Sequence, residues 1–247
     1  MRCMSVATDP PLDVATIVAA APLIRGKSKE IWRLGDHRCL VRLIPSLSSF
    51  TYDRHDLFAG TEVLRLDFFE MAARRLQQAG VPVAFEDRVG PDLYIADYCP
   101  GPPFEVIVKN VATGSTTRKY PDLFREGHRF AHPVVKFDYR VDPEDQPIAE
   151  DYVREAGCDA AAMKALALET NRVLRAWLAP RDLHDFCLIF GTDRHGRLGV
   201  VSEISPDAMR LKGPDGGSLD KDLFRRGGSR EDILTVWTRL VRELRAA

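Results

Sequence analysis

The chain has 247 residues, of which 45% are hydrophobic and 29% are charged, as is usual for a globular protein. Its formal net charge of −1 offers no general basic surface to nucleic acid or membrane lipid, so a phosphorylated ligand would need a local basic pocket. Five cysteines without CxxC spacing, no leader pattern and no apolar run of about 18 residues together predict a cytoplasmic protein with reduced thiols and no zinc site.

The first part of the chain predicts short strands and one amphipathic helix. The helix covers residues 66–78, where Phe69, Ala72 and Leu76 share one face, and Gly80 provides a stop. The predicted strands are residues 31–32, 39–44 and 93–97. Residues 99–103, which read Cys-Pro-Gly-Pro-Pro, are the most linker-like stretch and predict a hinge. We therefore divide the chain into two lobes, residues 1–99 and 100–247.

The second lobe is predicted to contain a strand, two helices and a hairpin. The strand covers residues 105–110. One helix starts after Asp159 as its N-cap, with an apolar face at Met163, Leu166, Ala167, Thr170, Leu174 and Trp177. The last helix starts near Ser229, with its apolar stripe at Ile233, Trp237, Leu240, Val241 and Leu244.

The hairpin is predicted from period-two alternation over residues 185–191, a turn at 192–196 and a second strand over 197–201. The buried face of its first strand would carry Phe186, Leu188 and Phe190. The other face would carry Asp185, Cys187 and Ile189. Ser202 is expected close to Ile189 across the ladder. This face is the one expected to meet a ligand.

Four motifs, in order along most of the chain, resemble the SAICAR synthetase (phosphoribosylaminoimidazole-succinocarboxamide synthase) family. They are Gly26-Lys27-Ser28-Lys29, Glu105 to Asn110 with Gly114-Ser115, the hairpin strand with Ser205-Pro206-Asp207 and Arg210, and Asp220-Lys221-Asp222-Leu223-Phe224-Arg225. The resemblance implies an α+β, two-lobed, ATP-grasp-like architecture. Residues 1–99 would form a nucleotide-binding lobe, and residues 100–247 a lobe with a ribonucleotide site.

Family members condense carboxyaminoimidazole ribonucleotide with L-aspartate, using ATP and Mg²⁺ to activate the carboxylate as an acyl phosphate. The resemblance therefore implies roles for particular residues. Lys27 and Lys29 match nucleotide-phosphate lysines and would share one face of a strand. The positions that match ribonucleotide-binding or substrate-adjacent residues are Lys109, Ser115, Asp185, Asp207, Arg210 and Arg225. Arg140 falls in the region associated with aspartate.

Each match has a structural alternative. The two lysines could be surface residues after a glycine turn, and Ser115 a polar turn residue. Asp207 could be an N-cap or Asx-turn residue, and Arg210 a surface ion pair.

Three departures from the family pattern lie together on the hairpin. Cys187 replaces a lysine, Ile189 a glutamate and Ser202 an aspartate. The two lost carboxylates are those that the resemblance assigns to ATP-bound Mg²⁺, and neither replacement is a good ligand for that cation. Glu203 survives but should point to the opposite face. The loop at residues 48–53 and the segment at 137–147 also fit poorly, although Asp142 or Asp145 could compensate.

We predict a repurposed SAICAR-synthetase-like enzyme that acts on an imidazole or purine ribonucleotide in purine-related nucleoside (antibiotic) biosynthesis, of the coformycin and pentostatin type. Its catalytic candidates are Asp185, Cys187 and Lys109; Lys27 or Lys109 could lower the pKa of a nucleophilic Cys187, or Cys187 could simply fill space. ATP and Mg²⁺ are expected only if the ancestral reaction is retained, and no metal site is predicted. The sequence is compatible with a monomer or a homo-oligomer. The alternatives are a working SAICAR synthetase and a non-catalytic nucleotide-binding protein.

Overall fold

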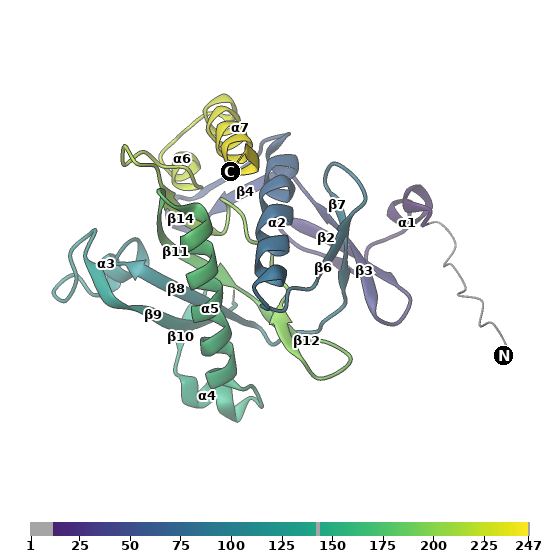
Figure 1. Cartoon of the computed structure of the whole chain (residues 1–247), viewed down its shortest axis with the longest axis horizontal. Helices are drawn as coiled ribbons and strands as arrows, with labels where there is room; N and C mark the ends of the chain where they lie inside the picture. Colours follow the sequence, from purple (N-terminus) through teal and green to yellow (C-terminus); the bar gives the residue numbers. More distant parts are fainter. Residues whose placement is uncertain (1–11, 142–143, 247) are drawn as a thin grey trace.

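Two antiparallel sheets of five strands each organise the chain in the computed structural model, which describes residues 12–141 and 144–246 (Figure 1). The first sheet has the order β1-β2-β3-β7-β6, with strands Ile24–Arg25, Lys29–Leu34, Arg38–Leu43, Leu93–Asp97 and Phe85–Arg88. The second has the order β10-β9-β8-β11-β14, with strands Gln146–Ile148, Arg129–Tyr139, Phe104–Val111, Asp182–Leu188 and Met209–Lys212. Alternate residues of each strand therefore face one side of its sheet.

Helices α2 (Thr61–Gln78) and α5 (Ala160–Leu178) stand against each other at the centre of the molecule (Figure 1). α2 packs on β3 and β6 of the first sheet, and α5 packs on β8, β9 and β11 of the second. The Asp159 carboxylate accepts a hydrogen bond from the Ala162 N–H at 2.9 Å, which confirms the predicted N-cap. The predicted helix over 66–78 begins five residues earlier, at Thr61.

Helix α7 (Arg230–Ala246) covers α2 near the C-terminus (Figure 1). Its N-terminus forms a capping box, because the Ser229 backbone N–H donates to Asp232 at 2.8 Å and the Asp232 N–H donates to the Ser229 hydroxyl at 3.2 Å. Its buried residues are the five predicted from the sequence: Ile233, Trp237, Leu240, Val241 and Leu244. The apolar periodicity of the sequence was therefore sufficient to predict the buried face of this helix.

Shorter elements connect these layers. They are α1 (Val14–Ala19), β4 (Ser46–Ser49), η1 (Phe50–Tyr52), β5 (Arg54–Leu57), α3 (Ser115–Lys119), α4 (Glu150–Glu155), β12 (Phe190–Thr192), β13 (Leu198–Val200) and α6 (Asp222–Arg225). Most of them, and the long strand β9, were not predicted. Within the described ranges, no helix is long and apolar enough to span a bilayer.

The predicted hairpin is correct only in part. β11 ends at Leu188, and the hairpin consists of β12 and β13 alone, whereas β11 pairs with β8 and β14. The chain changes sheets at Ile189, whose carbonyl accepts from the Val201 N–H and whose own N–H donates to the Ser202 hydroxyl, both at 2.9 Å. The expected closeness of Ser202 and Ile189 is confirmed. The predicted alternation is confirmed too, with Phe186, Leu188 and Phe190 fully buried.

The segment at 99–103 has no helix or strand and lies against β12. A Cβ atom on Gly101 would stand 2.2 Å from the Phe190 carbonyl oxygen, so only glycine permits this approach. A single hydrophobic cluster contains residues from both predicted lobes, including Phe69 of α2 and Leu174 of α5. The division at residue 99 stays a prediction.

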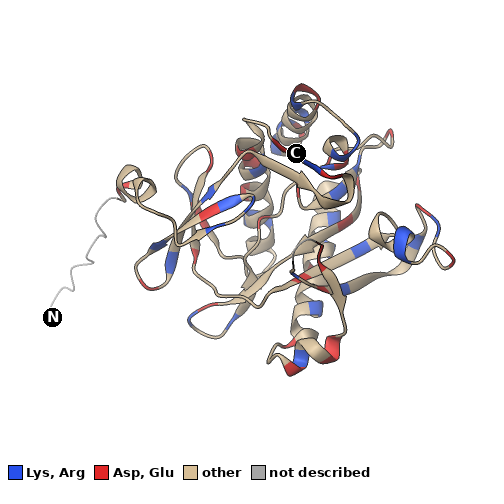
Figure 2. Ribbon diagram, turned by 180° about the vertical axis from the view of Figure 1, so that it is seen from behind, with Lys and Arg blue, Asp and Glu red and all other residues tan. Residues whose placement is uncertain are grey.

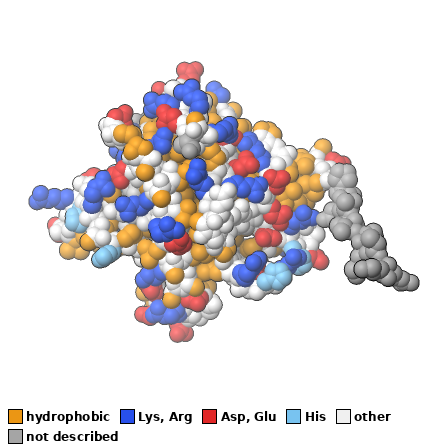
Figure 3. Space-filling view, in the orientation of Figure 1, with side chains coloured by type: hydrophobic (Ala, Val, Ile, Leu, Met, Phe, Trp, Pro, Cys, Tyr) orange, Lys and Arg blue, Asp and Glu red, His pale blue; other side chains and the backbone are white. Residues whose placement is uncertain are grey.

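Charged residues of both signs are interspersed along the ribbon rather than segregated (Figure 2). On the face shown in Figure 3, basic and acidic side chains likewise alternate with scattered hydrophobic ones. Scattered apolar side chains are normal on a protein surface. The informative charges are therefore those that lie inside the molecule.

Candidate functional site

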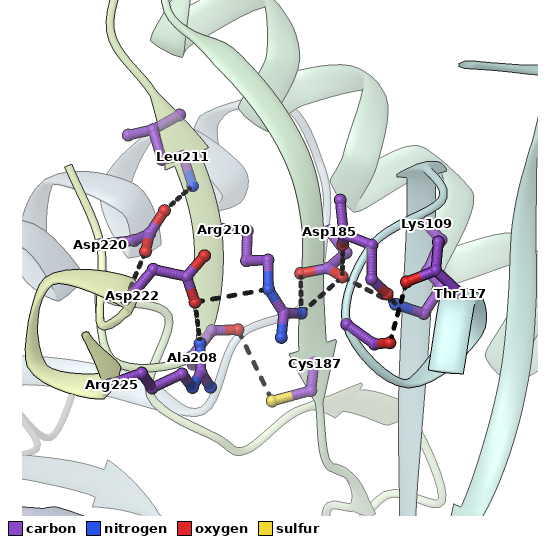
Figure 4. Close-up of polar contacts among 12 residues, drawn as sticks. Lys109, Thr117, Asp185, Cys187, Ala208, Arg210, Leu211, Asp220, Asp222 and Arg225 are labelled. Atoms are coloured by element: carbon purple, nitrogen blue, oxygen red, sulfur yellow. Dashed lines mark hydrogen bonds and ion pairs between the residues drawn. The ribbon is translucent and has the colours of Figure 1, made fainter. Parts of the chain in front are cut away.

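A buried charge cluster joins β8, β11 and β14 (Figure 4). Asp185 is directly opposite Lys109 in the β11–β8 register, and the Lys109 ammonium donates to its carboxylate at 2.7 Å. Arg210 donates to the same carboxylate at 2.8 and 3.1 Å, and the Thr113 hydroxyl donates at 3.0 Å. Burial alone would raise the pKa of Asp185, but Arg210 and Lys109 hold it at about 2. Asp185 is therefore an ionised, buried anchor.

A second row of charges extends this cluster toward α6. Arg225 donates to Asp222 at 2.7 Å, and Arg210 lies 3.5 Å from the same carboxylate. The Lys221 ammonium lies 2.8 Å from an oxygen of Asp207. Arg210 and Arg225 thus share one acceptor, Asp222. This shared carboxylate orients both guanidinium groups before a ligand binds.

Apart from Thr113 and Asp222, these residues line a cavity of about 270 Å³. Its walls carry the following charged and polar side chains: Glu105, Lys109, Ser115, Asp185, Asp207, Arg210, Lys221 and Arg225. Ile107, Cys187 and Met209 add an apolar strip. The cavity therefore brings together six of the seven residues predicted to meet the substrate. Arg140 is the exception.

A larger cavity, of about 880 Å³, adjoins the first and shares Glu105, Ser115 and Lys221 with it. Lys27, Lys29 and Arg140 line it. The expectation that both lysines lie on one strand is wrong, since β2 begins at Lys29 and Lys27 precedes it, yet both reach the same cavity. Burial lowers the pKa of Lys29, and nearby Glu203 opposes this effect.

Cys187 lies on β11 two residues from Asp185 and lines the smaller cavity. Its thiol contacts the Ala208 carbonyl oxygen at 3.6 Å (Figure 4). Burial raises its pKa well above the usual range, and the Glu105 carboxylate adds to the effect. The cation that opposes the shift is Lys221, and activation of this thiol by Lys27 or Lys109 stays a prediction. The arrangement favours the space-filling interpretation.

The positions that the resemblance assigns to Mg²⁺ do not provide a suitable set of ligands. Ile189 is a hydrocarbon, and the Ser202 hydroxyl already accepts from the Ile189 N–H. Glu203 points elsewhere, as predicted, and receives two hydrogen bonds from the fully buried Arg65 at 2.6 and 2.7 Å. Mg²⁺ prefers carboxylate oxygens with free lone pairs. Over residues 12–141 and 144–246, no group of three or more His, Cys, Asp or Glu side chains could hold a metal ion.

The loop at residues 48–53 crosses the rim of the larger cavity. Phe50 is 58% exposed and lines that cavity, and neighbouring Tyr52 is 56% exposed. Arg118 of α3 donates to the Thr51 hydroxyl at 3.2 Å and to Glu144 at 2.7 Å, which ties this loop to the segment after β9. Asp145 accepts from the Val141 N–H at 3.1 Å, whereas Asp142 lies outside the described residues.

Sequence reasoning assigned no role to three residues that shape the site: Glu105, Thr113 and Lys221. The signal for Glu105 was present, since it alternates with Ile107 and Lys109 on β8 and so shares their face. Thr113 and Lys221 lie in connecting segments, where no periodicity indicates direction.

Comparison with known proteins identifies the family. The SAICAR synthetase family model matches residues 22–240. The chain belongs to the SAICAR synthetase family. It is 34% identical over 218 residues to the phosphoribosylaminoimidazole-succinocarboxamide synthase of Methanocaldococcus jannaschii, covering 85% of this chain and 89% of that protein. The enzyme of the same name from Methanothermobacter thermautotrophicus is 32% identical over 234 residues, with 90% and 91% covered.

Solved structures agree with this assignment. A SAICAR synthetase in complex with ADP superposes with a TM-score of 0.84 at 25% identity, covering 91% of this chain and 97% of that one. The SAICAR synthetase of Pyrococcus horikoshii, at 24% identity, has a TM-score of 0.81 and covers 89% and 98%. The predicted α+β fold of this enzyme family is confirmed.

Proposed function

We propose that this SAICAR synthetase family member binds a phosphorylated imidazole or purine ribonucleotide in the 270 Å³ cavity and that its ATP- and Mg²⁺-dependent ligation of aspartate is absent or very slow. The observation that carries the proposed loss of ligation is the pair Ile189 and Ser202. Ile189 has no side-chain oxygen, and the Ser202 hydroxyl oxygen already accepts a hydrogen bond from the Ile189 N–H. The expected setting is purine-related nucleoside biosynthesis, as the family resemblance implies.

The ribonucleotide half of the proposal is supported by the charges of the cavity. Arg210 and Arg225 are held by Asp222, and Ser115 offers a hydroxyl on the same wall. Planar guanidinium groups with free N–H donors bind phosphate in two-pronged fashion. A Cβ atom on Gly114 would stand 2.5 Å from an Arg210 nitrogen, so glycine at this position leaves the guanidinium its room. The fold therefore holds these side chains in positions suited to binding an anion.

The proposed loss of ATP- and Mg²⁺-dependent ligation is supported by charge chemistry. Mg²⁺ neutralises the phosphate oxygens during acyl-phosphate formation, and protein carboxylates hold the ion in place. Neither Ile189 nor Ser202 has one, and Glu203 is committed to Arg65. Loss of a single electrostatic stabiliser commonly costs about 10²–10³ in rate. Loss of two carboxylates and the lysine at position 187 should cost more, though not additively.

The family relatives favour one alternative, a working synthetase. Both archaeal proteins named above are called phosphoribosylaminoimidazole-succinocarboxamide synthases and are more than 30% identical to this chain over most of its length. On this alternative, the protein would ligate L-aspartate to carboxyaminoimidazole ribonucleotide with metal ligands drawn from other positions. The two functions differ in whether ADP is released.

The test combines binding with turnover. Calorimetry with 5-aminoimidazole-4-carboxamide ribonucleotide and purine monophosphates should show binding. ADP release with carboxyaminoimidazole ribonucleotide, aspartate and Mg²⁺ should be absent or far below the roughly 1–10³ s⁻¹ typical of enzymes. Turnover near 1 s⁻¹ would establish the working synthetase instead. If no ribonucleotide binds, the ribonucleotide proposal is rejected.

A further inference from the structure

We propose that this protein has a second ligand site, a basic cavity formed where β11 begins and β14 ends, and that this cavity binds the phosphate group of a small phosphomonoester. Arg129, Arg181 and Lys212 are the cations that hold the phosphate. The site is separate from the ribonucleotide cavity, and the proposal does not depend on the function proposed above.

The cavity measures about 580 Å³, within the roughly 300–1,000 Å³ of small-molecule sites. Three segments supply its cations: Arg129 is the first residue of β9, Arg181 belongs to the connection from α5 to β11, and Lys212 is the last residue of β14. Of the described residues, none lines both this cavity and either of the two cavities discussed above. It is therefore a distinct site.

The position of His184 shows how the two sites are kept apart. His184 lines the basic cavity, whereas Asp185, the next residue of β11, lines the ribonucleotide cavity. Successive side chains of a strand point to opposite faces of its sheet. A ligand in the basic cavity therefore lies on the opposite side of β11 from the Asp185 cluster.

Cations outnumber carboxylates on the wall of this cavity. Among its described lining residues, Asp182 is the one carboxylate. Arg129 donates to both oxygens of Asp182, and the His184 Nε2 atom lies 3.0 Å from it. The hydrogen bond from Arg129 lowers the pKa of Asp182. Asp182 is thus ionised and neutralises one cation, which leaves the charges of Arg181 and Lys212.

Arg181 has the largest unused capacity for hydrogen bonding. Its side chain is only 12% exposed, and its one hydrogen bond to a described residue is from Nη2 to Glu243 at 2.5 Å. A guanidinium group has five N–H donors in a fixed planar arrangement. None of the Arg181 nitrogens is both buried and without a partner, so its remaining donors are reachable from the cavity that it lines. A nearly buried guanidinium with unused donors is suited to an anion.

Lys212 adds a second cation that its neighbours do not fully neutralise. Its ammonium donates to the Ser218 hydroxyl at 2.6 Å and lies 3.5 Å from Asp222. Asp222 is shared with Arg210 and Arg225, so three cations surround this carboxylate. Lys212 therefore contributes positive charge to the basic cavity.

A phosphate fits this arrangement better than a carboxylate. The cations come from three separate segments, and the tetrahedral oxygens of a phosphate can accept hydrogen bonds from several directions at once. The two oxygens of a carboxylate lie in one plane and are filled by one guanidinium group, as Asp182 is by Arg129. Pro180 and Pro214 give the cavity uncharged walls for the organic part of the ester.

The experiment is an NMR titration of the isotope-labelled protein with ribose 5-phosphate, inorganic phosphate and acetate, at about 0.15 M salt to screen weak attraction. The amide signals of Gly213 and Gly216 report on the basic cavity, and that of Ser115 reports on the ribonucleotide cavity. With ribose 5-phosphate, the two glycine signals should shift to saturation with a Kd at or below about 1 mM. Inorganic phosphate should bind there more weakly, and acetate should not saturate the shifts.

Arg181→Gln should weaken the affinity read from the two glycine signals by about tenfold or more, as expected for a lost charged donor, and leave the response of Ser115 unchanged. Arg172→Gln is the matched control, since Arg172 is an exposed arginine of α5 paired with Glu169, and it should change neither response.

The proposal is overturned if the glycine signals do not saturate with ribose 5-phosphate, or if their affinity is the same in Arg181→Gln as in wild type. Equal binding of acetate would overturn the phosphate class, and equal binding of inorganic phosphate would overturn the ester. Should Arg181→Gln not fold, Arg129→Gln must weaken the same affinity, and an unchanged value rejects the site. Because Ser115 is read separately, loss of its response alone bears only on the ribonucleotide cavity.

Discussion

Lys109 and Asp185 face each other across β8 and β11 with an ammonium–carboxylate distance of 2.7 Å, and their side chains are only 3% and 5% exposed. A lysine makes one point contact here, so Arg210 and Thr113 fill the remaining acceptor sites of Asp185. This shared carboxylate is the structural centre of the site.

Breaking this pair should destabilise the protein strongly. Lys109→Met leaves Asp185 buried with Arg210 as its only cation, and removal of one partner of a buried pair typically costs about 3–5 kcal/mol. Urea unfolding measures this loss. Lys109→Arg, which keeps the charge, should lose less. Arg172→Ala, which breaks an exposed pair with Glu169, is the control and should change stability little. Equal stability of Lys109→Met and wild type would contradict the buried pairing.

The same pair predicts a pH dependence of stability. The folded pKa of Asp185 is lowered from 3.8 to about 2, so its contribution is fully present above about pH 4 and is lost as the pH falls toward 2. Unfolding free energies measured between pH 5 and pH 2.5 should fall. The fall should be smaller in Asp185→Asn, which has no proton to take up. A parallel fall in both proteins would assign the effect to other carboxylates.

Asp220 should act in the opposite direction. Burial and the neighbouring Asp222 raise its folded pKa from 3.8 to about 6, although the N–H groups of Leu211 and Asp222 donate to it at 2.6 Å each. As the pH rises from 4 to 6, the unfolded chain releases this proton first, so the contribution of Asp220 to stability decreases across that interval. The stability difference between wild type and Asp220→Asn should therefore change between pH 4 and pH 7 in favour of the variant. An unchanged difference would argue against the raised pKa.

Arg210→Ala should weaken ribonucleotide binding by about 1.5–3 kcal/mol, the range for a hydrogen bond to a charged group. Calorimetry with 5-aminoimidazole-4-carboxamide ribonucleotide measures this change, and circular dichroism must confirm that the variant is folded, since Arg210 also binds Asp185. Arg242→Ala on α7 removes a distant arginine and should leave the affinity unchanged. An undiminished affinity in Arg210→Ala would exclude a ligand contact by this guanidinium.

Restoring the family residues tests whether positions 187, 189 and 202 account for the loss of ATP and Mg²⁺ binding. In the triple variant Cys187→Lys, Ile189→Glu, Ser202→Asp, Mg²⁺-dependent ATP binding should reappear, because two carboxylates and the ammonium return together. None of the single variants should regain it. A folded triple variant without ATP binding would place the divergence elsewhere, first in the loop at 48–53, where Phe50 lines the larger cavity.

The sequence alone determined helices α5 and α7 and the family. In α5 and α7 the caps Asp159 and Ser229 and the apolar stripes lie within one short window of chain, so local periodicity was enough to predict them. The same holds for β7, whose predicted bounds match the structure. The ordered motifs identified the family because they bring characteristic residues to recognisable spacings.

Only the tertiary structure decided how the site is connected. β11 ends at Leu188 because Ser202, 13 residues later, binds the Ile189 N–H, and no local pattern records that contact. The raised pKa values of Cys187 and Glu105 depend on burial and on charged residues from other segments of the chain, among them Asp138, Asp145 and Lys221. Hydrophobic periodicity is a property of neighbouring residues, whereas charge pairing and desolvation are set by residues that meet only when the sheets have formed.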